Sequence, residues 1–121
     1  MNQPQIETSR ELANHVREAL DDGKAVDIRV LEVAAMTSIT DFMIVASGRS
    51  SRQVKALTER LREAVQDFGS EVRGMEGQQG GEWVLVDLGD VVVHIMQPET
   101  RDFYQLEKLW ELEPHTAHEP G

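Results

Sequence analysis

The sequence predicts an α/β (α+β) domain in which helices pack against a mixed sheet of about five strands, in the order α-β-β-α-β-β-β-α. Three observations support this fold class. Apolar residues recur at helical spacing near the start and again after residue 50, residues 24–30 alternate with a period of two, and two β-rich runs flank Gly89-Asp90. The chain of 121 residues suits one domain, which we place at residues 1–112.

The N-terminal half is expected to form the first helix and the first two strands. A helix is predicted to begin at Thr8 or Ser9, which are both suitable N-caps, and to stop at Gly23. Residues 24–30 alternate as in a strand with one face in water, and a polar connection follows. Residues 42–46 are all apolar, which predicts a strand buried on both faces in the middle of the sheet.

The clearest helix follows that strand. Gly48 breaks the strand, Ser50 or Ser51 can cap the helix, and apolar residues then recur at helical intervals up to a stop at Gly69. Residues 70–74 are a candidate short strand, and the glycines between residues 74 and 81 predict the longest loop of the domain.

The C-terminal half is expected to contain a hairpin and a closing helix. Residues 82–88 and 91–96 flank Gly89-Asp90, a pair that suits a two-residue type II′ turn. Pro98 is tolerated in a first helical turn, and the helix after it is predicted to bury an apolar stripe made of Phe103, Leu106, Leu109 and Trp110. The two prolines within residues 113–121 predict a disordered tail.

Composition and charge restrict the possible functions. The chain has no cysteine, which excludes disulfides, thiolate nucleophiles, iron–sulfur clusters and cysteine-ligated zinc. The formal net charge of −10 disfavours direct binding to DNA or to the RNA backbone and favours a basic protein partner. Residues 49–62 are an exception, with five basic residues against one acidic residue, and form either a solvated helix face or part of a contact surface. The start of the chain lacks the pattern of a secretory signal and no apolar run reaches the roughly 20 residues of a membrane span, so the expected location is cytoplasmic.

The turn at Gly48–Ser51 is a candidate anion site, because amides at a helix N-terminus favour negative charge. It lacks the Lys-Ser/Thr ending of a phosphate-binding loop, so a purely structural turn is the preferred interpretation. Such a turn also opens the nucleotidyltransferase fold, where paired carboxylates hold magnesium. Asp87 and Asp90 are three residues apart, whereas strand residues share a face at two, so we expect turn and partner-facing roles and no enzyme activity.

Histidines and aromatic residues are the remaining candidates. His94 stands in an apolar strand, where a lone histidine is usually structural or interfacial, although a triad with Ser50 and Asp87 is chemically conceivable. The histidines at 115 and 118 have no other soft ligands nearby, so no metal or cofactor site is expected. Trp83 and Tyr104 are out of step with the predicted core stripes, which leaves an interface position and a core position equally open for both.

Two long segments resemble the Iojap or ribosomal silencing factor family. The first is the run Thr37-Ser-Ile-Thr-Asp-Phe-Met-Ile-Val-Ala-Ser-Gly-Arg-Ser-Ser-Arg-Gln-Val54. The second is residues 83–96 followed by residues 101–110, in the order and spacing of the family's other hallmark. The resemblance covers about residues 8 to 112, and only the proline-containing tail lies outside the pattern.

The resemblance implies a nucleotidyltransferase-like fold without catalytic activity, often a homodimer. Such a protein binds ribosomal protein fourteen of the large ribosomal subunit and blocks joining with the small subunit, which represses translation. The positions that match the family's partner-facing motif are Trp83, Asp87, Leu88, His94 and Tyr104. A large-subunit assembly factor is the first alternative, and a nucleotide-binding enzyme that uses the Gly48–Ser51 turn is the second.

Overall fold

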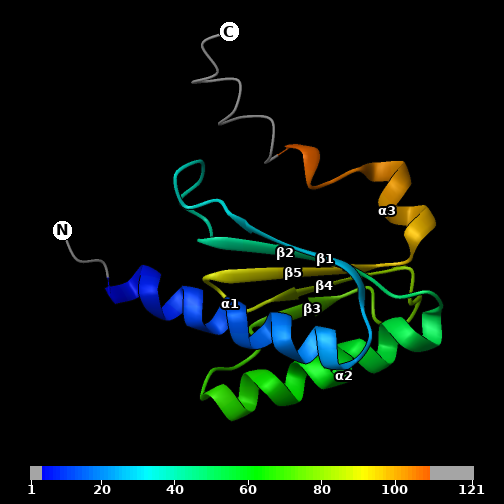
Figure 1. Cartoon of the computed structure of the whole chain (residues 1–121), viewed down its shortest axis with the longest axis horizontal. Helices are drawn as coiled ribbons and strands as arrows, with labels where there is room; N and C mark the ends of the chain where they lie inside the picture. The colour runs from blue at the N-terminus through cyan, green and yellow to red at the C-terminus, as the bar shows by residue number, and fades with distance from the viewer. Residues whose placement is uncertain (1–3, 110–121) are drawn as a thin grey trace, which may run out of the picture.

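A computed structural model describes residues 4–109 of the chain (Figure 1). Helices and strands follow the predicted order α-β-β-α-β-β-β-α. Their bounds are α1 Pro4–Asp22, β1 Val26–Glu32, β2 Phe42–Ser47, α2 Ser51–Phe68, β3 Gly74–Glu76, β4 Trp83–Asp87, β5 Val91–Met96 and α3 Pro98–Tyr104. Trp110 and the predicted tail at residues 113–121 lie outside the described part of the chain. None of the described helices is long and apolar enough to cross a membrane.

The five strands form one mixed sheet, as predicted, and their order in the sheet is β1-β2-β5-β4-β3. β2 and β5 run parallel, and the other neighbouring strands are antiparallel. Every residue of β2 is buried, so the expectation of a strand covered on both faces is confirmed. Its expected place in the middle is wrong, because the β4–β5 hairpin adds to β2 through β5 and leaves β5 at the centre.

The two faces of the sheet are covered differently. Helices α1 and α2 lie side by side on one face, which we call the helix face, and α3 lies at one end of the sheet on the other side, which we call the α3 face (Figure 1). The main core fills the space beneath the two long helices and includes Val16, Leu20, Ile44, Leu57, Leu61, Val84, Val93 and Ile95. A smaller apolar cluster lies on the α3 face and consists of Val33, Met43, Val45 and Met96, with Leu31, Met36, Trp83 and Leu106 packed against it.

The capping and glycine signals in the sequence predicted both ends of α2 correctly. The Ser50 side chain accepts a hydrogen bond from the Gln53 amide at 3.1 Å, and Gly69 ends the helix with a left-handed φ of 92°. The predicted start of the first helix is wrong, since α1 begins at Pro4. Ser9 is instead buried inside α1, where its hydroxyl donates to the Asp41 carboxylate at 2.9 Å.

Two further boundaries differ from the prediction. The short strand expected at residues 70–74 is β3, Gly74–Glu76, because the regular register with β4 begins at Gly74, which lies opposite Asp87. The closing helix stops at Tyr104, because Gln105 takes a left-handed conformation with φ of 48°. The expected buried stripe is therefore broken: Phe103 is 79% exposed and Leu109 67% exposed, while Leu106 is half-buried on the α3 face.

Candidate partner-binding face

Strand alternation brings Trp83 and His94 together on the α3 face. In β4, Val84 is buried against the long helices, so Trp83 and Leu85 point to the opposite side. Leu85 pairs with His94 across the hairpin, which makes Trp83 and His94 diagonal neighbours. The Trp83 indole Nε1 donates a hydrogen bond of 3.0 Å to Nδ1 of His94.

This hydrogen bond and its surroundings determine the state of His94. Since Nδ1 accepts, the neutral ring carries its proton on Nε2. The residue is only 6% exposed, and desolvation by burial lowers the pKa of His94 to about 4. His94 is therefore an uncharged structural residue near neutral pH. The conceivable triad is not assembled, because the Ser50 oxygen caps α2 and Nδ1 of His94 is occupied by Trp83.

An aromatic patch, which we define as Trp83, Phe103 and Tyr104, extends outward from this pair. The ring centroids of Trp83 and Tyr104 lie 4.9 Å apart, and Phe103 meets Tyr104 edge-on at the same distance. Trp83 is half-buried and Tyr104 is 55% exposed. The spacing of Phe103 predicts a core position, but the structure shows it on the exposed side of α3, with Arg101 on the buried side.

Asp87 lies on the α3 face near the other end of β4 and is half-buried. One oxygen of its carboxylate accepts a hydrogen bond from the Gly89 amide at 2.8 Å, so Asp87 supports the turn between β4 and β5. Leu88 is separated from the other four predicted positions, because its side chain is 4% exposed and belongs to the core of the helix face. Asp90 is exposed in the turn, and residues 4–109 contain no group of three acidic or histidine side chains able to hold a metal ion.

The basic stripe at residues 49–62 lies mainly on α2, on the side of the sheet away from the aromatic patch. Arg49, Arg52 and Lys55 are exposed, whereas Arg62 pairs with Glu59 at 3.7 Å within the helix. A solvated helix face and a contact surface both remain consistent with this placement.

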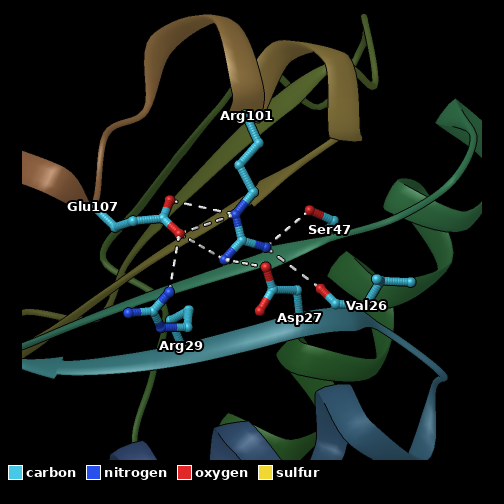
Figure 2. A network of polar contacts seen from close by, with 6 residues as sticks. All are labelled: Val26, Asp27, Arg29, Ser47, Arg101 and Glu107. Atoms are coloured by element: carbon cyan, nitrogen blue, oxygen red, sulfur yellow. Dashed lines mark hydrogen bonds and ion pairs between the residues drawn. The ribbon is translucent and has the colours of Figure 1, made fainter.

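A buried ionic network lies at the β1–β2 side of the α3 face (Figure 2). The Arg101 side chain is 8% exposed and Glu107 accepts from it, at 2.9 Å from Nη2 and at 3.3 Å from Nε. The other end of the guanidinium, Nη1, donates to the Ser47 hydroxyl at 2.9 Å and to the Val26 carbonyl at 3.4 Å. Asp27 adds a longer ion pair at 3.6 Å.

The network also determines the charge of Glu107. Burial by itself raises the pKa of the Glu107 carboxyl, but the hydrogen bonds and positive charge of Arg101, with a smaller contribution from Arg29, outweigh it and leave that pKa lowered. Sequence reasoning assigned no role to Arg101 or Glu107. They are six residues apart across a non-helical link, and their partners come from strands more than 50 residues away.

These features define a small α+β protein whose sheet is covered by two long helices on one face and presents an aromatic patch on the other. The chain belongs to the ribosomal silencing factor family: residues 6–120 match the family model described as "Ribosomal silencing factor during starvation". The family resemblance of the sequence is thereby confirmed.

Individual relatives agree with this assignment. The ribosomal silencing factor RsfS of Chromobacterium violaceum is 48% identical over 101 residues, which are 84% of this chain and 83% of that protein. A crystal structure of a protein from Chromobacterium violaceum is similar with a TM-score of 0.82 at 47% identity, covering 84% of this chain and 85% of that chain. The mouse protein named "Mitochondrial assembly of ribosomal large subunit protein 1" is 36% identical over 91 residues, 73% of this chain but 40% of that protein.

Proposed function

We propose that this protein binds the large ribosomal subunit through ribosomal protein fourteen and blocks joining with the small subunit, which represses translation. The names of its relatives support a role at the ribosome, and the mouse name specifies the large subunit. The observation that carries the docking part is the aromatic patch, where the Tyr104 ring contacts Trp83 at a centroid distance of 4.9 Å yet remains 55% exposed. Large, rigid aromatic side chains of this kind are favoured interface anchors.

Charge supports the same partner class. Ribosomal proteins are mostly basic, and a chain with a formal net charge of −10 meets a basic surface by long-range attraction. Asp87 lies on the same sheet face as Trp83, at the other end of β4, and adds a negative charge to that face. His94 supports Trp83 from beneath through its ring nitrogen.

The mechanism is occlusion of the subunit-joining surface. Inhibition then follows occupancy and needs no catalysis, metal or cofactor. We expect the protein to act in the cytoplasm, and a homodimer is the state that the family resemblance suggests for the free form.

The test is a gradient experiment with purified components. The protein is mixed with large subunits, small subunits are added, and both its co-migration with the large subunit and the yield of joined ribosomes are measured. We expect co-migration and fewer joined ribosomes. Absence from the large-subunit peak would refute the proposal.

Alanine variants of the aromatic patch test whether it is the surface that binds the large subunit. Trp83→Ala and Tyr104→Ala are each expected to weaken binding by about 2 kcal/mol, roughly 30-fold, because they remove anchors of the patch. The matched control is Ile39→Ala, which shortens a side chain that is 83% exposed in the β1–β2 loop, at the opposite end of the sheet from α3 (Figure 1). If the Trp83→Ala and Tyr104→Ala variants fold correctly and bind the large subunit as tightly as the wild type does, the interface lies elsewhere.

The name of the mouse relative also favours a second candidate, a factor that accompanies assembly of the large subunit. The same gradient separates the two roles. Binding without any loss of joined ribosomes would support the assembly role and contradict occlusion.

A further inference from the structure

The segment from Pro98 to Leu109, which we call the α3 arm, has little apolar contact to hold it in place. Phe103, Tyr104 and Leu109 are all more than half exposed, and only Leu106 packs partly against the smaller apolar cluster. Helix α3 is seven residues long, a length at which an isolated helix is not stable in water. Something other than hydrophobic burial must therefore keep the arm in one conformation.

The buried network supplies that attachment. Arg101 and Glu107 are the two residues of the arm that are charged and yet buried, at 7% and 9% exposed. The ion pair between Arg101 and Glu107 links the two parts of the arm that lie before and after Gln105, which has a left-handed conformation. The Nη1 bonds to Val26 and Ser47 then tie the closed arm to β1 and β2 (Figure 2).

The geometry makes the network an internal attachment of the arm. Every nitrogen of the Arg101 guanidinium already has an acceptor or a carboxylate partner within the chain. The arm is held at one side by this network and at the other by the ring contact between Tyr104 and Trp83 of β4. Breaking one partner of a buried ion pair leaves an uncompensated charge, so loss of either residue is expected to release the arm.

We infer that Arg101 and Glu107 are positioning residues that hold the α3 arm as a preformed docking element presenting Phe103 and Tyr104 to the partner. This inference rests on the proposed function for the identity of the partner. Its physical basis is that a partner which needs the ordered arm binds in proportion to the fraction of molecules in which the arm is ordered. The network raises that fraction before the partner arrives.

Amide hydrogen exchange of the free protein tests the attachment. The variants are Arg101→Gln and Glu107→Gln, and the control is Arg10→Gln, which removes the same charge from a half-exposed pair with Glu32. The reporting amides are those of Gln105 and Lys108, which bond within the arm. We expect their exchange to accelerate by about tenfold or more in both variants, with the strand amides and the control unchanged. Wild-type exchange rates in the arm of both variants would overturn the inference. If Arg101→Gln does not fold, the result for Glu107→Gln alone decides the test.

Affinity for large subunits tests the positioning role. We expect Arg101→Gln to weaken binding by about tenfold in the wild-type background but by less than about twofold in the Phe103→Ala/Tyr104→Ala background, because Arg101 acts through those two rings. An equal loss in both backgrounds would show general support of the fold and overturn positioning. If the wild type itself does not bind large subunits, the proposed function fails, whereas the exchange result still decides whether the network holds the arm.

Discussion

Acidification from about pH 7.5 to about pH 5 is expected to destabilise the protein by about 2 kcal/mol through His94 alone. The imidazole has an ordinary pKa of 6.5 when the chain is unfolded, and burial lowers the pKa of His94 to about 4 in the folded protein. Between these values the unfolded chain holds more protons than the folded one. Acid therefore shifts the equilibrium toward unfolding, and the contribution of neutral His94 is complete only above pH 6.5.

The magnitude follows from the two pKa values. Well below the unfolded pKa, each pH unit removes about 1.4 kcal/mol, until the folded residue also takes up its proton. By about pH 5 the accumulated loss is about 2 kcal/mol, and it approaches about 3 kcal/mol near the folded pKa. His94 is 6% exposed, so solvent screening does not reduce the shift substantially.

The assay is urea unfolding at a series of pH values for the wild type and His94→Asn. Asparagine keeps an oxygen acceptor near the position of Nδ1 for the Trp83 indole, but it does not titrate. Subtracting the two free energies of unfolding cancels the carboxyl groups that the proteins share. We expect the difference to change by about 2 kcal/mol over this pH range. Parallel curves for the two proteins would refute the assignment of a buried, neutral His94.

Three further substitutions test the turn, the loop and the helix cap. Asp87→Lys should mainly slow association with the large subunit, and this effect should become smaller as the salt concentration rises. The control Asp87→Asn removes the charge but keeps an oxygen acceptor for the Gly89 amide. An effect of Asp87→Lys that does not depend on salt would contradict the electrostatic role of Asp87. Gly77→Ala should lower the free energy of unfolding by more than about 1 kcal/mol, because Gly77 has φ of 85° and an added Cβ would overlap the carbonyl oxygen of Trp83. An unchanged denaturation midpoint would contradict this expectation. Ser50→Ala should cost about 1 kcal/mol by leaving the Gln53 amide without its cap, again measured by denaturant unfolding, and no loss would show that the cap contributes nothing.

The elements predicted best are those with local signals at both ends. The α2 helix has a serine cap, a regular apolar stripe and a terminal glycine, and all three features take the positions expected of them. The hairpin follows in the same way from two β-rich runs around Gly89, whose φ of 91° requires the freedom of glycine. Here residues close in sequence determine the structure, so periodicity and turn chemistry were sufficient.

Predictions failed where distant residues decide the outcome. Thr8 and Ser9 are good caps in isolation, yet α1 extends past them to Pro4, and Ser9 bonds to Asp41 instead. The predicted helix stop at Gly23 is confirmed, because α1 ends at Asp22, although the residue with the left-handed conformation is Lys24. An added Cβ on Gly23 would lie 2.7 Å from the Leu57 side chain, so glycine there allows the close approach of α2.

The candidate site shows the same division. Trp83 and His94 were selected by their place in the family motif, and their pairing follows from the hairpin register. The exposure of Tyr104 was one of two alternatives that spacing left open. Phe103 was assigned to the wrong side, and Leu88, selected with the others, lies in the core of the helix face.

Periodicity, turn residues and contiguous motifs were sufficient to predict the class of fold, the succession of its elements and the family. They did not show which aromatic side chains are exposed or how the last segment is held. Both depend on contacts between distant residues, because Arg101 faces its acceptors on β1 and β2 and Gln105 ends α3 in a left-handed conformation. Those acceptors are 54 and 75 residues away in the chain and become neighbours of Arg101 only after the sheet has formed.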